Sequence, residues 1–123
     1  MLKGFENITF ELTDKEKELI PIIIRGLKGK KGKDKAVTGT KICKAMKIDG
    51  ARLRKIISYI RVNDLMYGLC SSSVGYYTAE NITELEECII SLKQRVAAQV
   101  KVLNSLEKKT LMFGGSGQTS LFE

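Results

Sequence analysis

Residues 51–62 carry the pattern that most constrains the fold, because their apolar side chains recur at positions i, i+3, i+4 and i+7. This stripe consists of Leu53, Ile56, Ile57 and Ile60, and it predicts a helix that faces a core. The turn 47–50 precedes it, and Asp49 in that turn is a residue type that caps helices. The chain has 123 residues, enough to bury such a stripe without disulfides or a metal.

Capping signals predict three more helices. Thr13-Asp14-Lys15-Glu16 is a capping box, and the helix that it starts should end between Gly26 and Gly29. Thr38 or Thr40 should begin a second helix, whose inward-facing residues are Ile42, Cys43 and Met46. Asn81 or Thr83 should open a last helix that reaches Lys109, with a second capping box over 83–86.

Strand signals are few. Residues 65–70 and 76–79 predict a short hairpin around a polar turn at 71–75. Tyr76 and Tyr77 point to opposite faces of their strand, so one of them should pack inward. Residues 5–12 have period-two apolar spacing, which suits a short strand or an extended arm. The fold class is therefore mainly α with a small β-hairpin (α+β).

Charge is unevenly distributed along the chain. There are 21 lysines and arginines against 14 acids, a net charge of +7. Residues 25–61 have a net charge of +11, with only Asp34 and Asp49 as acids, and the remainder has −4. Such segregation favours an anionic partner, nucleic acid first, although a lysine-rich loop can also be a merely solvated one.

Several kinds of chemistry are disfavoured. The chain contains no His, which removes Ser-His and Cys-His mechanisms and His-containing metal sites. Cys43, Cys70 and Cys88 are too few for an all-cysteine zinc site, and we expect reduced, packed thiols in a reducing cytoplasm. No apolar run is long enough to span a membrane, and the N-terminus lacks a signal-peptide core. We expect a non-enzymatic, cytoplasmic protein without cofactor, metal or membrane partner.

The order of elements resembles a winged helix-turn-helix domain. The residues that carry the resemblance are TGTKICKAMKIDGARLRKIISYIRVNDLMYGLCSSSVGYYTA, positions 38–79, about a third of the chain. In that family the second helix of the pair enters the major groove of double-stranded DNA and the wing touches the flanking backbone. The resemblance implies that residues 38–47 form the first helix and 51–62 the recognition helix. The pattern is similar to small winged-helix proteins encoded by phages and prophages.

The outer face of the helix over 51–62 is small, polar and basic, as a groove-reading surface requires. We expect the lysines of the 28–35 loop to lie near it and to contribute phosphate contacts. The candidate DNA-binding residues are Lys28, Lys30, Lys31, Lys33, Lys35, Lys41, Arg52, Arg54, Lys55, Ser58, Arg61 and Ser72. The alternatives are an amphipathic helix with solvated cations, or a winged helix that binds only protein.

The end of the sequence contains a second signal. Residues 118–122, Gln-Thr-Ser-Leu-Phe, resemble the pentapeptide by which bacterial proteins bind the DNA polymerase sliding clamp. Gln118, Ser120, Leu121 and Phe122 match that pattern, and Thr119 replaces the usual Leu. The preceding Gly-Gly-Ser-Gly has the composition of a flexible linker. The resemblance implies clamp binding; a chance match, or a tail that packs on the domain, is the alternative.

The last predicted helix has apolar residues in 4-3 spacing, which fits pairing with a second copy. They are Leu85, Ile89, Leu92, Val96, Leu103 and Leu106. The alternative is that this stripe docks on the first helix of its own domain. We therefore expect a domain over 1–110 with a long C-terminal helix, a tail over 111–123, and a homodimer through 85–106 as one option.

Three hypotheses about function follow. The first is a non-catalytic DNA-binding protein, nucleoid-associated and linked to replication or to a phage, which its tail recruits to the sliding clamp. The second is a dimeric winged-helix transcription regulator in which the tail has no role. The third is an interaction protein that occupies the clamp and blocks host polymerases.

Overall fold

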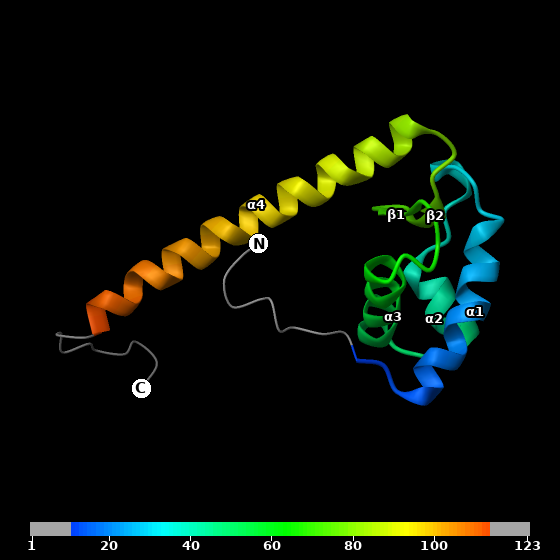
Figure 1. The fold of residues 1–123 in the computed structure, drawn as a ribbon, viewed down its shortest axis with the longest axis horizontal. Helices are drawn as coiled ribbons and strands as arrows, with labels where there is room; N and C mark the ends of the chain where they lie inside the picture. Colours follow the sequence, from blue (N-terminus) through cyan, green and yellow to red (C-terminus); the bar gives the residue numbers. More distant parts are fainter. Residues whose placement is uncertain (1–10, 114–123) are drawn as a thin grey trace. The chain divides into compact units, whose positions relative to one another are not determined.

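The computed structural model describes residues 11–113 (Figure 1). Residues 11–88 form one compact unit, and the remainder of the last helix belongs to a second. The elements, in chain order, are α1 (Asp14–Lys28), the 3-10 turn η1 (Lys33–Lys35), α2 (Gly39–Met46), α3 (Gly50–Val62), β1 (Leu69–Ser72), β2 (Gly75–Thr78) and α4 (Ile82–Phe113).

The first three helices begin where the capping residues predict. The Thr13 hydroxyl accepts a hydrogen bond from the Glu16 N–H, and the Glu16 carboxylate accepts one from the Thr13 N–H at 2.8 Å. Thr38, rather than Thr40, caps α2, and Asp49 caps α3 by accepting from the Arg52 N–H at 2.8 Å. The structure thus confirms these helix starts. They were predictable from the sequence because a capping side chain bonds to a backbone N–H only three residues away.

The start of α4 differs from the capping box predicted at Thr83. Asn81 is the cap, since its side-chain oxygen accepts from the Glu84 N–H at 3.0 Å. The Glu84 carboxylate accepts instead from the backbone N–H groups of Glu80 at 2.8 Å and Lys33 at 2.9 Å. Glu84 therefore ties the lysine loop, defined as residues 28–35, to the start of α4. The helix also continues past Lys109 to Phe113.

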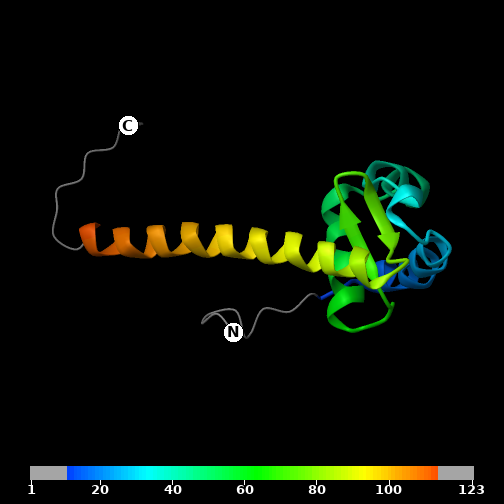
Figure 2. The ribbon, with the colours of Figure 1, turned by 90° about the horizontal axis from the view of Figure 1, so that it is seen from above.

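The hairpin is shorter than predicted and starts later. In its antiparallel register Leu69 lies opposite Thr78 and Ser72 opposite Gly75, so the turn is only residues 73 and 74 (Figure 2). The prediction of a strand from Leu65 is wrong, as is the placing of Ser71 and Ser72 in the turn. Asp64 and Gly68 have left-handed backbone angles, so the chain is still turning between α3 and β1.

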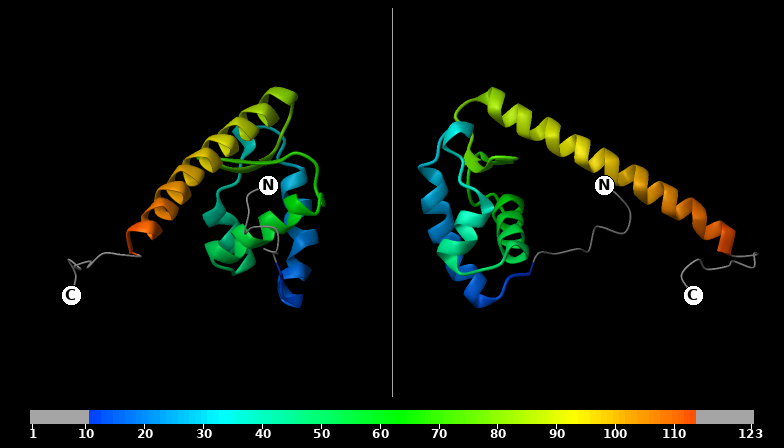
Figure 3. Two further views of the ribbon diagram at one scale, coloured as in Figure 1. Left: turned by 60° about the vertical axis from the view of Figure 1, so that its left-hand side comes forward. Right: turned by 180° about the vertical axis from the view of Figure 1, so that it is seen from behind.

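The core of this first unit lies between α1, α3 and the hairpin (Figures 1 and 3). Ile56 and Ile60 of α3 are completely buried, which confirms the stripe predicted over 51–62. Tyr77 is buried and Tyr76 half-buried, so one tyrosine of the pair packs inward as expected. The half-buried apolar residues of α2 pack against this core: Ile42, Cys43 and Met46.

The fold class is confirmed as mainly helical with a small two-stranded antiparallel sheet. Within residues 11–113, none of the helices combines the length and apolar character that crossing a membrane demands. The predicted strand or arm over 5–12 lies almost wholly outside the described residues, and so does the pentapeptide at 118–122.

Candidate nucleic-acid interface

The lysine loop is held against the sheet by backbone hydrogen bonds. The Gly32 N–H donates to the Thr78 carbonyl at 2.9 Å, and the Thr78 N–H donates to the Lys30 carbonyl at 2.9 Å. Val37 and Tyr76 exchange two hydrogen bonds of 2.8 Å. The backbone of the segment is thus placed along the free edge of β2, while its lysine side chains are exposed: Lys28, Lys30, Lys31, Lys33 and Lys35.

The basic residues at the start of α3 form a second group, the α3 cluster, defined as Arg52, Arg54 and Lys55. Arg52 and Arg54 are exposed and Lys55 is half-buried. Arg54 extends back along its helix: a Cβ added to Gly50 would lie 3.2 Å from its guanidinium. Arg54 is therefore close to the N-terminus of α3, where helix backbone N–H groups also attract phosphate.

A buried carboxylate neutralises part of the α3 cluster. Glu16 of α1 is only 3% exposed, and its carboxylate lies 3.2 Å from the Lys55 ammonium and 3.9 Å from the Arg52 guanidinium. The backbone N–H of Thr13 and the Lys55 ammonium both favour the ionised form, so the pKa of Glu16 lies below its ordinary value despite burial. The sequence pattern indicated Glu16 only as a capping residue.

The two basic groups lie at opposite ends of α1. The α3 cluster faces Glu16 in the first turn of α1, whereas the lysine loop follows Lys28 at its last turn. The intervening residues span about 18 Å of helix. The expected proximity of the loop lysines and the arginines at the start of α3 is therefore wrong, because the two groups lie at opposite ends of α1.

Arg61 points toward the hairpin. Its guanidinium donates to the Leu69 carbonyl and to the Ser71 hydroxyl, both at 3.2 Å. These bonds tie the last turn of α3 to β1, so Arg61 orients the hairpin relative to the helix. Of the other predicted contacts, Ser58 is half-buried on α3, and the Ser72 hydroxyl accepts from the Val74 N–H at 3.2 Å within the turn.

Helix α2 adds exposed cations. Lys41 was predicted and is exposed; Lys44 and Lys47 are also exposed, although the sequence pattern did not single them out. Lys47 adopts the left-handed conformation at the end of α2, and the Ile48 N–H donates to the Cys43 carbonyl at 3.0 Å. This tight turn brings α3 directly after α2. Lys44 could have been predicted as a candidate DNA-binding residue, because it lies within the basic segment 25–61.

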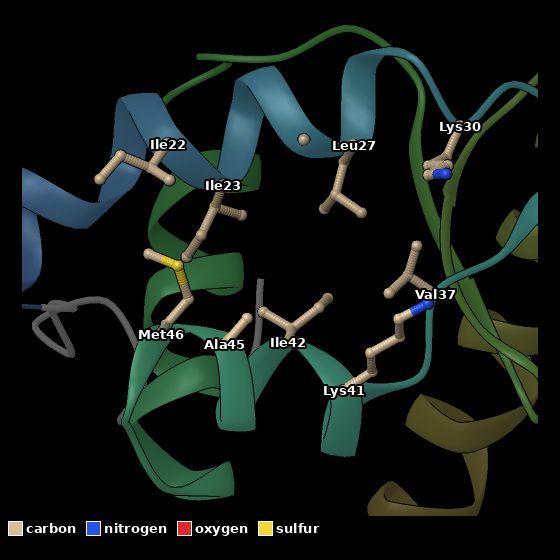
Figure 4. A pocket seen from close by; sticks show the side chains of 10 residues that line it. Ile22, Ile23, Leu27, Lys30, Val37, Lys41, Ile42, Ala45 and Met46 are labelled. Atoms are coloured by element: carbon tan, nitrogen blue, oxygen red, sulfur yellow. The ribbon is translucent and has the colours of Figure 1, made fainter.

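An apolar groove separates α1 from α2 (Figure 4). It has a volume of about 340 Å³, and its floor includes Ile23, Leu27 and Ile42. Lys30 and Lys41 lie at the end near Val37. Apart from these two lysines the lining is apolar, and none of the α3 cluster residues lines the groove.

The three cysteines are free thiols. Burial, together with the neighbouring Cys88 thiol, raises the pKa of Cys70 to about 12. Cys70 is therefore protonated and unreactive near neutral pH. Among the described residues, no group of three or more Cys, Asp or Glu is arranged to hold a metal ion.

Comparison of the chain with protein-family models, with curated proteins and with solved structures gave no match.

Proposed function

We propose that residues 11–88 form a winged helix-turn-helix domain that binds double-stranded DNA without catalysing a reaction. The carrying observation is the order α2, tight turn, α3, hairpin within a segment whose positive charge is exposed on α2, α3 and the preceding loop. In this arrangement α3 is the recognition helix and the hairpin is the wing.

Each basic group has a distinct role in the proposed complex. Arg54, which has no acidic partner within the described residues, contacts a base edge or phosphate near the start of α3. Arg52 and Lys55 contribute less charge because Glu16 partly neutralises them. The loop lysines contact phosphates at a separate place, since about 18 Å corresponds to roughly five base-pair steps along one strand. Arg61 positions the wing.

A titration of labelled duplex DNA at several salt concentrations tests the proposal. We expect log affinity to fall with log salt with a slope of about −4 to −5, corresponding to about five phosphates neutralised. Arg54→Ala should weaken binding about five- to hundredfold. Lys108→Ala removes the same charge from an exposed site in the second unit and should have little effect. The proposal is contradicted if the affinity for DNA does not depend on salt concentration, or if Arg54→Ala and Lys108→Ala weaken DNA binding equally.

The pentapeptide at 118–122 suggests where this DNA-binding activity is used. We propose that Gln118, Ser120, Leu121 and Phe122 bind the DNA polymerase sliding clamp and recruit the domain to replicating DNA, in a bacterial or phage setting. Leu121 and Phe122 would supply the apolar anchors of a small interface. A transcription regulator without clamp binding, and a clamp-blocking protein without DNA binding, are the competing proposals.

A further inference from the structure

The distal part of α4 carries an apolar stripe that continues to the end of the helix. The stripe positions recur with 4-3 spacing: 85, 89, 92, 96, 99, 103, 106, 110 and 113. They are apolar except for Gln99 and Thr110. Ile89, Leu92, Val96, Leu106 and Phe113 are each between 42% and 69% exposed. The opposite face is mostly polar, with Glu87, Gln94, Lys101, Ser105 and Lys108, although Ile90, Leu111 and Met112 also lie outside the stripe.

The spacing of this stripe indicates pairing with another helix. A stripe with a period of 3.5 residues rotates by about 20° per heptad around the axis of a straight helix. A second helix can therefore stay in contact with the whole stripe only if the two helices supercoil around each other. The stripe spans about 42 Å. Burying an apolar side chain removes about 60–120 Å² from water, so two copies of the stripe bury on the order of 1,200 Å². That area suffices for a specific interface.

We propose that the protein is a homodimer in which the two α4 helices form a parallel, in-register coiled coil. In this arrangement Gln99 of one copy faces Gln99 of the other, and the two amides hydrogen-bond across the seam. In the antiparallel registers with most overlap, Gln99 faces Val96 or Leu103 of the other copy, which leaves the amide without a partner. A buried polar pair of this kind selects register.

The charges beside the stripe also favour the parallel arrangement. A parallel pair places no like charges at its facing flank positions. Of the two antiparallel registers with most overlap, the one that places Gln99 opposite Val96 brings Glu86 next to Glu107, a like-charge contact. The other brings Arg95 next to Lys109 but also Lys93 next to Glu107, so its like and opposite charges offset each other. The Glu86–Glu107 contact is therefore an independent reason to reject the first register, and the unpaired Gln99 amide remains the reason to reject the second.

The dimer deepens the proposed function, on which this consequence rests. A parallel coiled coil brings both copies of residues 11–88 to the same end of the supercoil. Two α3 helices related by a two-fold axis would then bind two half-sites of opposite orientation, so an inverted repeat is the preferred DNA.

Light scattering coupled to size exclusion tests the dimer without DNA. We expect twice the chain mass for the full protein at tens of micromolar. Leu103→Glu should give the monomer mass, whereas Ser105→Glu adds the same charge on the opposite face and should stay dimeric. A wild-type protein with the mass of a monomer overturns the proposal. If the wild type is monomeric and Leu103→Glu lowers its Tm, the stripe packs on its own domain instead.

Cross-linking tests the direction of the helices. Leu106→Cys should form an intermolecular disulfide under mild oxidation, well above the background from the native thiols of the wild type. Cross-linking only in a mixture of Ile89→Cys and Leu106→Cys chains indicates an antiparallel pair and overturns the parallel arrangement. Failure of DNA binding in an intact dimer would reject the proposed function alone.

Discussion

Glu16 is the residue on which charge and stability at the interface both depend. It is ionised, nearly inaccessible, and shared between the capping of α1 and the cations of α3. Because its negative charge lies against Arg52 and Lys55, it lowers the positive potential of the α3 cluster, which is the surface that DNA would meet in the proposed complex. The same contact holds the first turn of α1 to α3.

Glu16→Gln should therefore change DNA affinity and stability in opposite directions. The neutral amide keeps the shape of the side chain but releases Arg52 and Lys55, so duplex DNA should bind more tightly with a steeper salt dependence. The free energy of unfolding should fall. Fluorescence anisotropy and urea titration measure the two effects. Weaker DNA binding by a variant shown to be folded would contradict this role.

The same carboxylate predicts a pH dependence. Its pKa in the folded protein is below the ordinary value of 4.5, so its stabilising contribution is complete above about pH 4.5 and is lost as the pH falls through the folded pKa. In urea titrations over pH 3–6, the acid-side loss of stability should be smaller in Glu16→Gln than in the wild type.

At the scale of elements, the lysine loop and the hairpin meet at Gly75. This glycine begins β2 with a φ of 127°, and an added Cβ would collide with the Val37 carbonyl and lie 2.8 Å from the Thr38 nitrogen. The absence of a side chain at position 75 lets the loop backbone pass against the strand. The cap of α2 at Thr38 follows directly, so the close approach also positions α2.

Gly75→Ala should destabilise the domain by more than about 2 kcal/mol, because both the backbone angle and the contact with Val37 oppose a Cβ. Gly29→Ala is the matched control, since a Cβ there meets nothing within 4 Å and its φ is −83°. Its effect should stay below about 1 kcal/mol. Urea unfolding of both variants gives the comparison; equal effects would show that the strand and loop can separate freely.

At the scale of the whole molecule, the proposal divides the functions along the chain. In the proposed arrangement, residues 11–88 would bind DNA, α4 would join two copies, and the segment 118–122 would bind the clamp. Gly-Gly-Ser-Gly at 114–117 separates the last two parts in the sequence. Such a division predicts that each activity can be removed without loss of the others.

Deleting residues 118–123 should abolish clamp binding while leaving the Tm and the DNA affinity nearly unchanged. Calorimetry with a peptide of this segment should show binding to the clamp. Thr119→Leu should tighten it by about 1 kcal/mol, because an apolar contact replaces a hydroxyl. A peptide that releases no heat and does not compete with a clamp ligand would remove clamp recruitment from the proposal.

Local sequence patterns were enough to predict the helix starts at Thr13 and Asp49, the buried stripe of α3 and the burial of one tyrosine of the pair. Helix caps and apolar periodicity depend on residues only a few positions apart, so these patterns can be recognised in the sequence alone. They were insufficient for the exact starts of α2 and α4, where Thr38 competed with Thr40 and Asn81 with Thr83. They were also insufficient for the hairpin, whose register depends on its partner strand.

Contacts between distant parts of the chain determine which basic residues are free of an acidic or backbone partner. The Glu16–Lys55 pair joins positions 39 residues apart, and Thr78 bonds to the Leu27 carbonyl across 51 residues. A charge count cannot show that Glu16 offsets two cations, that Arg61 orients the hairpin, or that the lysine loop and the α3 cluster lie at opposite ends of α1. Those outcomes depend on which elements pack together, because ion pairs and hydrogen bonds are decided by distance in space rather than along the chain.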